Sequence, residues 1–171
     1  MIITEPKWKS YIVETTTPVF TPEQCQKIIE AGRKQPRQDA QVGTTKKGEV
    51  DTDTRISHIS WIPFDSLQPM YKEIEELMLR TNGNHFGFEG MQITELAQYT
   101  EYAEGGFYDW HVDNDVSFEK EPPVRKISMT LALSPDNEFE GGGLELMAEG
   151  KIVKPKQGHA IFFASFVRHR A

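Results

Sequence analysis

The chain has 171 residues, of which 37% are hydrophobic and 26% are charged. These are globular values that exclude a disordered polypeptide, and the length suffices to bury a core without disulfides. The formal charge of −7 argues against non-specific binding to nucleic acid or to an anionic membrane. Cys25 is the only cysteine, which excludes an internal disulfide and a thiolate metal site. There is no signal-peptide pattern and no run of roughly 20 apolar residues that could span a membrane, so we expect a cytoplasmic protein.

The first part of the chain predicts one short strand and one helix. Residues 10–15 favour a strand, and a helix start signal follows. Thr21 is a typical N-cap and Pro22 takes the first helical position. Gln24 stands three residues after the cap, which is the spacing of a capping box. Gly32 is the expected C-cap of this helix.

A long polar segment and a second helix come next. Residues 36–53 lack apolar periodicity, so we expect an exposed loop, which is either a substrate lid or a merely flexible connection. A strand is expected over residues 56–62. Asp65 or Ser66 is the expected cap of a helix that ends at Asn82. The apolar residues of this helix recur at helical spacing, which indicates core packing rather than a binding groove: Leu67, Met70, Ile74, Leu77 and Met78.

From residue 91 onward the sequence consists of short segments with β-propensity. They are separated by Gly, Pro, Asn and Asp and comprise residues 91–99, 107–113, 125–133, 143–147, 150–154 and 159–166. In the third segment, Ile127 and Met129 alternate with Ser128 and Thr130. This alternation predicts a strand with one face in the core and a small or polar face that lines a cavity.

The order of these elements predicts the fold class. Two helices followed by a run of strands indicate an α+β fold, with the helices packed outside a double-sheet jelly roll or barrel. We expect a single domain over residues 1–171. Its helical support would cover about residues 18–83 and its β-core about residues 91–171.

The triplet His111-Val112-Asp113 and the distant His169 carry most of the chemical information. Side chains alternate along a strand, so His111 and Asp113 would face one cavity and Val112 the opposite wall. A ligand from a distant strand would then place two imidazoles and one carboxylate on one side of a metal. The opposite positions would stay open, which suits a non-haem Fe(II) centre that binds a co-substrate and O2 together. The alternatives are a hydrogen-bonded core histidine and an aspartate that caps the following turn.

The remaining histidines allow simpler interpretations. His169 stands between two arginines, so a solvated surface histidine is the alternative to a third metal ligand. His159 follows a turn glycine, and we interpret it as structural. Two further histidines have no carboxylate or histidine in register and are also interpreted as structural: His58 and His85.

Further motifs surround the triplet in a distinctive order. They are Tyr102 nine residues before His111, Tyr108 three residues before it, the cluster Gly141-Gly142-Gly143, the turn Pro155-Lys156-Gln157-Gly158, and the distal His169. This succession, over roughly residues 95–171, resembles the prolyl 4-hydroxylase-like branch of the 2-oxoglutarate- and Fe(II)-dependent dioxygenases. The resemblance implies a double-stranded β-helix that binds iron through His111, Asp113 and His169.

The resemblance also implies roles for two tyrosines. Tyr102 corresponds to a family tyrosine that hydrogen-bonds 2-oxoglutarate, and Tyr108 corresponds to one near the substrate and the metal. A buried tyrosine with a satisfied hydroxyl is the alternative for both. The glycine cluster at 141–143 is interpreted as a turn that binds no ligand.

One feature of the family does not occur in this sequence. Relatives place a Lys or Arg roughly ten residues beyond the distal histidine, where it pairs with the far carboxylate of 2-oxoglutarate. Only Arg170 and Ala171 follow His169 here, so we expect the natural protein to continue with a strand that carries the basic residue. The alternatives are an impaired site or a basic residue already present: Arg125, Arg168 or Arg170.

The sequence thus predicts an Fe(II)- and 2-oxoglutarate-dependent dioxygenase that hydroxylates a C–H bond, with a prolyl residue of a peptide or protein as the first choice of substrate. By the resemblance, O2 is the oxidant, succinate and CO2 are formed, and ascorbate is the reductant for over-oxidised iron. Arg55 and the loop at 36–53 are candidates for gripping an extended peptide. One alternative substrate is a free amino acid, another small molecule or a nucleobase side group, of which the acidic charge weakens the last. A metal-binding or interaction module without turnover is the other alternative.

Overall fold

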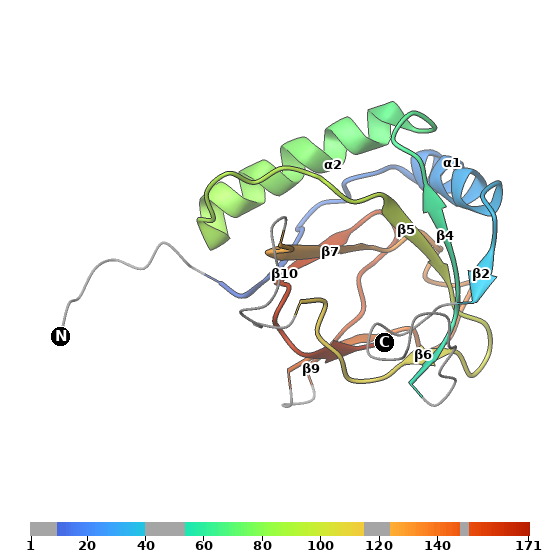
Figure 1. Ribbon diagram of the computed structural model, residues 1–171. Coiled ribbons are helices and arrows are strands. Elements are labelled where there is room, and N and C mark those ends of the chain that lie inside the picture. Colours follow the sequence, from blue (N-terminus) through green and yellow to red (C-terminus); the bar gives the residue numbers. More distant parts are fainter. Residues whose placement is uncertain (1–9, 40–53, 115–123, 148–150) are drawn as a thin grey trace.

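The computed structural model describes residues 10–39, 54–114, 124–147 and 151–171, and its mixed helices and antiparallel strands confirm the α+β class. The helical elements are α1 (Pro22–Arg33), α2 (Gln68–Thr81) and the π-helical η1 (Asn82–Phe86). The strands are β1 (Ile12–Glu14), β2 (Gln38–Asp39), β3 (Arg55–Ile56), β4 (His58–Ile62), β5 (Ala97–Glu101), β6 (Phe107–Tyr108), β7 (Ile127–Leu131), β8 (Leu144–Leu146), β9 (Lys151–Val153), β10 (Ala160–Ala164) and β11 (His169–Arg170). Figure 1 shows α1 and α2 on the same side of the strands, with β6 and β9 on the far side.

Helix α1 begins at the predicted capping box. The Gln24 backbone N–H donates to Thr21 Oγ1 at 3.3 Å, and the Thr21 N–H donates to Gln24 Oε1 at 2.8 Å. The predicted C-cap is wrong, because the helix continues through Gly32 and its C-cap is Lys34. Gly32 instead allows close packing against Tyr99, whose ring would lie 2.3 Å from an added Cβ.

Helix α2 joins two parts of the hydrophobic core. The predicted caps at Asp65 and Ser66 are wrong, because the helix begins at Gln68 after Leu67, which makes no side-chain cap. Pro69 explains the position, since proline suits the first turn of a helix. The predicted apolar stripe is confirmed as core packing. Its first half packs beside α1, β4 and β5, and its second half packs against β7, β8, β9 and β10.

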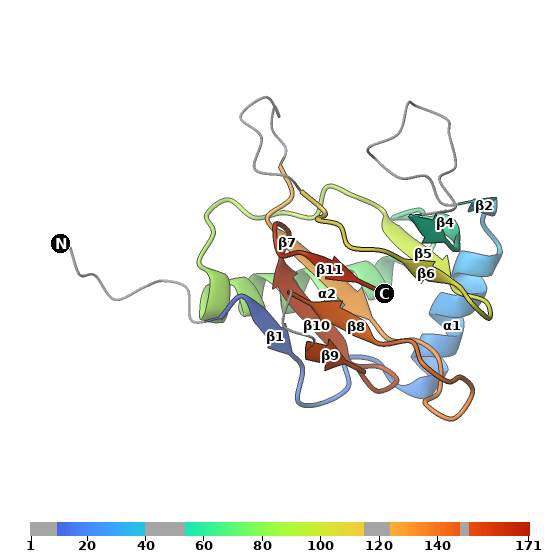
Figure 2. The same ribbon diagram turned by 90° about the horizontal axis from the view of Figure 1, so that it is seen from below.

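The strands form antiparallel sheets with the orders β1-β10-β7, β11-β8-β9, β2-β4-β5 and β3-β6. All five residues of β10 are buried, as expected for the central strand of a sheet covered on both faces. Backbone hydrogen bonds also connect β6 to the segment after β11, because Tyr108 and Ala171 exchange both N–H···O bonds at 2.8 and 2.9 Å. The sheets β3-β6 and β11-β8-β9 are therefore continuous at this point, and Figure 2 shows β11 beside β8.

The observed strands are shorter than predicted. The segment 56–62 lies in two strands, β3 and β4, which belong to different sheets and are separated at Ser57. Of the expected strand 107–113, only Phe107–Tyr108 is regular, and His111 makes one isolated bridge. The predicted loop 36–53 contains β2 at Gln38–Asp39, and its residues 40–53, where we expected a lid, lie outside the described residues. None of the described helices is both long and apolar enough to cross a bilayer.

Candidate metal centre

Two histidines far apart in the chain are brought together by backbone pairing. The His111 N–H donates to the His169 carbonyl at 2.9 Å, and the His169 N–H donates to the His111 carbonyl at 2.9 Å. Residues that face each other in an antiparallel pair project their side chains to the same side. The two rings therefore lie 4.1 Å apart between centroids, and the simpler interpretation of His169 as a surface residue is wrong, because it is 5% exposed.

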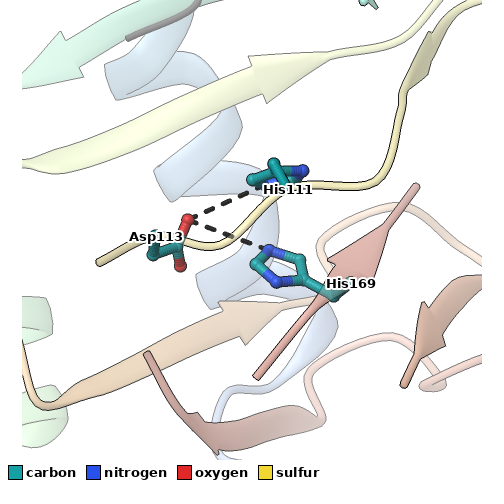
Figure 3. A group of neighbouring side chains, drawn as sticks. All are labelled: His111, Asp113 and His169. Atoms are coloured by element: carbon teal, nitrogen blue, oxygen red, sulfur yellow. Dashed lines mark ion pairs between the residues drawn. The ribbon is translucent and has the colours of Figure 1, made fainter. Parts of the chain in front are cut away.

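Asp113 completes a cluster with these two rings, as Figure 3 shows. Asp113 Oδ1 lies 3.7 Å from His111 Nε2 and 3.8 Å from His169 Nε2. All three donor atoms lie within 4.8 Å of one another. Ligands bound at about 2.1 Å and at right angles lie about 3 Å apart, so shifts of roughly 1 Å would bring all three to bonding distance of one ion. The prediction that His111 and Asp113 face the same side is confirmed.

The protonation pattern of both imidazoles suits metal binding. His111 Nδ1 lies 2.7 Å from the Asp109 carbonyl oxygen, and His169 Nδ1 lies 3.0 Å from the Val167 carbonyl oxygen. A carbonyl only accepts, so each Nδ1 carries a proton, and in the neutral tautomer this leaves the Nε2 lone pair directed toward Asp113. Burial, together with the neighbouring His169 ring, lowers the pKa of His111 to about 4, which keeps this imidazole neutral at pH 7.

The second oxygen of Asp113 has its own partners. The Ser128 hydroxyl donates a short hydrogen bond to Asp113 Oδ2, and Arg125 Nη1 lies 3.5 Å from the same oxygen. Arg125 is also paired with Glu95 through Nη2. Ser128 lies on the polar face predicted for β7, and this face meets Asp113, although no role for Ser128 was expected.

Tyr108 and Arg55 lie beside the cluster. The Tyr108 ring stacks on His111 with centroids 3.4 Å apart and an interplanar angle of 12°. The Arg55 guanidinium lies 4.3 Å from the Tyr108 ring centroid, in cation–π contact. Three residues of spacing would put Tyr108 and His111 on opposite faces of a regular strand. A β-bulge corrects this, because two residues, Asp109 and Trp110, stand opposite Arg170 between the two hydrogen-bonded pairs.

Arg55 is a buried charge with neutral partners. It is 6% exposed, its Nε donates to Ser57 Oγ at 2.8 Å, and its Nη2 donates to Gln98 Oε1 at 3.0 Å. Among the described residues no carboxylate lies within 4.0 Å of it. Tyr102 lies close to the same guanidinium but is 43% exposed, so it is not the buried core tyrosine of the alternative interpretation. Although part of the Tyr102 ring is exposed, desolvation of the hydroxyl groups raises the pKa of Tyr102 and of Tyr108, so both hydroxyls stay protonated and able to donate.

Two of the basic residues considered for the far carboxylate of a co-substrate face elsewhere. Arg168 and Arg170 lie over the Trp110 ring, at 5.5 and 5.0 Å from its centroid, and Arg170 is paired with Glu145. Trp110 directly precedes His111 and lies beside Arg170, so its ring is on the face of the sheet opposite the His111 ring. Neither arginine therefore reaches the metal cluster.

The other histidines lie outside the cluster. His159 Nδ1 is 2.9 Å from the Thr15 carbonyl oxygen, which agrees with a structural role. The expectation that His58 has no carboxylate in register is wrong, because β2 pairs Asp39 with it and the side chains approach to 2.9 Å. This partner was missed because β2 lies in a segment that was expected to be a loop. His85 is part of η1.

Comparison with known proteins agrees with this geometry. The sequence model of the 2OG-Fe(II) oxygenase superfamily matches residues 97–171, the part that contains the whole cluster. Over these residues the chain is similar to the 2OG-Fe(II) oxygenase superfamily. A PKHD-type hydroxylase of Synechococcus sp. (strain CC9311) is 36% identical over 116 residues, which cover 64% of this chain and 50% of that protein. The chain thus spans about half the length of this curated relative.

Several solved structures share the fold of this chain. A prolyl-4-hydroxylase from Pseudomonas putida aligns with a TM-score of 0.73 and 20% identity, covering 95% of this chain and 85% of that one. The collagen prolyl hydroxylase of Paramecium Bursaria Chlorella virus-1, solved with 2OG, aligns with a TM-score of 0.71 and 18% identity, covering 94% and 87%. A prolyl hydroxylase from Trichoplax adhaerens aligns with a TM-score of 0.72 and 16% identity, covering 95% and 77%.

The superfamily implies Fe(II) and 2-oxoglutarate, and the residues present fit the metal. Two imidazole nitrogens and one carboxylate oxygen form the donor set typical of non-haem Fe(II) oxygenases. The Nδ1–carbonyl hydrogen bonds add the outer contacts that normally orient ligating histidines.

Proposed function

We propose that the chain is an Fe(II)- and 2-oxoglutarate-dependent dioxygenase that hydroxylates a C–H bond of a prolyl residue in a peptide or protein. The convergence of two imidazole nitrogens and one carboxylate oxygen is the observation that carries the proposal. The substrate class is supported by structural relatives that are prolyl hydroxylases, one of them solved with a peptide fragment of hypoxia inducible factor. We also propose that the two sets of strands, β1-β10-β7 and β3-β6-β11-β8-β9, are the layers of a double-stranded β-helix within a single domain.

Each part of the site has a proposed task. Bound Fe(II) and 2-oxoglutarate would supply the oxidising chemistry, in which O2 is consumed, succinate and CO2 are released, and ascorbate restores over-oxidised iron. His111, Asp113 and His169 would hold the metal from one side and leave the other side free for ligands.

Tyr108 and Arg55 are proposed to contact the substrate. Both lie on the His111 side of the sheet, and Tyr108 covers the His111 ring. A buried guanidinium without a carboxylate partner is costly unless oxygen atoms satisfy its donors. Arg55 has only neutral partners among the described residues, so a carbonyl or carboxylate oxygen of the substrate would complete its hydrogen bonds.

Tyr102→Phe tests the proposed contact with 2-oxoglutarate. The change removes one hydroxyl and keeps the ring, so loss of a charge-assisted hydrogen bond is expected to weaken co-substrate binding by about 1.5–3 kcal/mol. The midpoint of thermal unfolding should not change, because Tyr102 is exposed. Anaerobic titration of 2-oxoglutarate into iron-loaded protein measures the affinity, with Tyr11→Phe as a control at another exposed tyrosine. Unchanged affinity would remove Tyr102 from the co-substrate site.

Turnover of 2-oxoglutarate tests the function itself. Purified protein with Fe(II), O2 and ascorbate is expected to form succinate, and a proline-containing peptide should increase the rate and gain one oxygen atom by mass spectrometry. The same peptide with proline replaced by alanine is the control. Stimulation by free proline but not by peptides would favour the small-molecule alternative. No succinate from any of these mixtures, with iron bound, would contradict the proposed activity.

A further inference from the structure

We infer that Ser128 and Arg125 are positioning residues that hold Asp113 as a one-oxygen metal ligand and so keep a coordination position free. The inference rests on the proposed function, because it concerns the metal which that function requires. Ser128 and Arg125 contact Asp113 Oδ2 and not the histidine nitrogens of the cluster, so their task would be to orient the carboxylate.

The two oxygens of Asp113 have different surroundings. Figure 3 shows one oxygen directed at both imidazoles and the other turned away from them. The oxygen turned away, Oδ2, accepts the short hydrogen bond from Ser128 and lies 3.5 Å from Arg125 Nη1. Oδ1 is therefore directed at the metal position while Oδ2 is held on the opposite side.

The residues that hold Oδ2 are themselves fixed. Ser128 is 7% exposed and lies in β7, paired with Phe163 of the buried strand β10. The Arg125 guanidinium is paired with Glu95. The backbone carbonyl of Arg125 accepts a hydrogen bond from Ser165 Oγ at 2.6 Å. The Asp113 backbone is fixed by the same serine, because its N–H donates to the Ser165 carbonyl at 3.1 Å. Rotation of the Asp113 carboxylate would break the contacts of Oδ2 with Ser128 and Arg125.

This arrangement has a consequence for coordination. A carboxylate can bind a metal through one oxygen or through both. Two imidazoles and a single carboxylate oxygen leave half of an octahedral shell open, which accommodates a chelating co-substrate and O2 together. If Asp113 bound the metal through both oxygens, the second oxygen would occupy one of these open positions. An Oδ2 that was not held by Ser128 and Arg125 would therefore compete with 2-oxoglutarate for a coordination position.

Ser128→Ala tests the inference on Mn(II)-loaded protein under anaerobic conditions. Pulsed EPR in deuterated water counts the water molecules on the metal, and the variant is expected to carry one fewer than the wild type. Its affinity for 2-oxoglutarate should fall on the order of tenfold, in the range expected when an outer contact of a metal ligand is lost. Thr130→Ala is the matched control, because Thr130 is an exposed hydroxyl residue two positions along the same strand.

Two more variants complete the experiment. Ser128→Thr keeps the hydroxyl and is expected to restore both readouts. Ser128→Ala with Arg125→Met should enlarge the loss of 2-oxoglutarate affinity and keep the water count one below that of the wild type. Wild-type water count and wild-type 2-oxoglutarate affinity in that double variant would overturn the inference. The proposed function fails separately if 2-oxoglutarate displaces no water from the wild-type metal, and the water count of the variants still decides how Asp113 binds.

Discussion

Asp113→Ala is expected to lower the affinity for Fe(II) by more than about 100-fold, since losing even an outer contact of a ligand costs up to that much. The change removes the only anionic donor of the cluster and leaves the two imidazoles. The fold should persist, because the Asp113 backbone keeps its bond to Ser165 and Arg125 keeps its pair with Glu95. Anaerobic titration with Fe(II), or with Mn(II) as a redox-stable substitute, measures the affinity, and circular dichroism checks the fold.

Asp109→Asn is the control for this experiment. Asp109 is an exposed aspartate in the same segment, and its carboxylate is not part of the cluster. Its backbone carbonyl, which orients His111, is unchanged by the substitution. The control should bind Fe(II) like the wild type. Full metal occupancy in Asp113→Ala would show that the ion is held elsewhere.

Gly158→Ala is expected to lower the free energy of unfolding by about 2–4 kcal/mol. Gly158 has φ +80°, where an L side chain is strained, and an added Cβ would lie 2.1 Å from the Phe20 carbonyl oxygen. The Phe20 carbonyl cannot move away easily, because both sides of the contact are held by backbone hydrogen bonds. The Val19 and Phe20 N–H groups donate to the Gly158 carbonyl at 2.7 and 3.3 Å. The Gly158 N–H donates to the Ala132 carbonyl at 2.8 Å. The turn thus ties the start of α1 to the sheet that contains β7 and β10. Urea unfolding followed by circular dichroism measures the loss.

Gly83→Ala is the matched glycine control. An added Cβ at Gly83 meets nothing within 4 Å, and its φ is not positive. Stability should stay the same or rise slightly, because alanine loses less backbone entropy on folding. If Gly158→Ala unfolds at the same urea concentration as Gly83→Ala, the segment before α1 can move away from the turn.

Local sequence signals predicted much of the fold. The capping box of Thr21 and Gln24 and the apolar stripe of α2 depend on contacts within one helix and its neighbours, and both were confirmed. The alternation in β7 correctly predicted that Ser128 lies on a polar face. The start of α2 was missed because a proline, rather than a capping side chain, defines it.

The assembly of the site depends on pairings between distant parts of the chain, which a single sequence does not reveal. The spacing of His111 and Asp113 predicted that they share a face, but His169 was assigned through the family resemblance, and its bridge to His111 depends on tertiary register. The same limit applies to Arg125, whose pairing with Asp113 is a tertiary contact that no local pattern predicts. The partner of His58 was missed for this reason too, since β2 is only two residues long.

The bulge at Asp109 and Trp110 has a consequence for transplanting this centre into another scaffold. A designer who grafted only the three donor side chains onto a regular hairpin would preserve the coordinating atoms, yet a tyrosine three positions before the first histidine would project from the wrong face. The aromatic cover of His111 and its neighbouring arginine would both be lost. The smallest unit that keeps these contacts is therefore the irregular segment from Tyr108 to Asp113, its partner segment from His169 to Ala171, and Arg55 of β3.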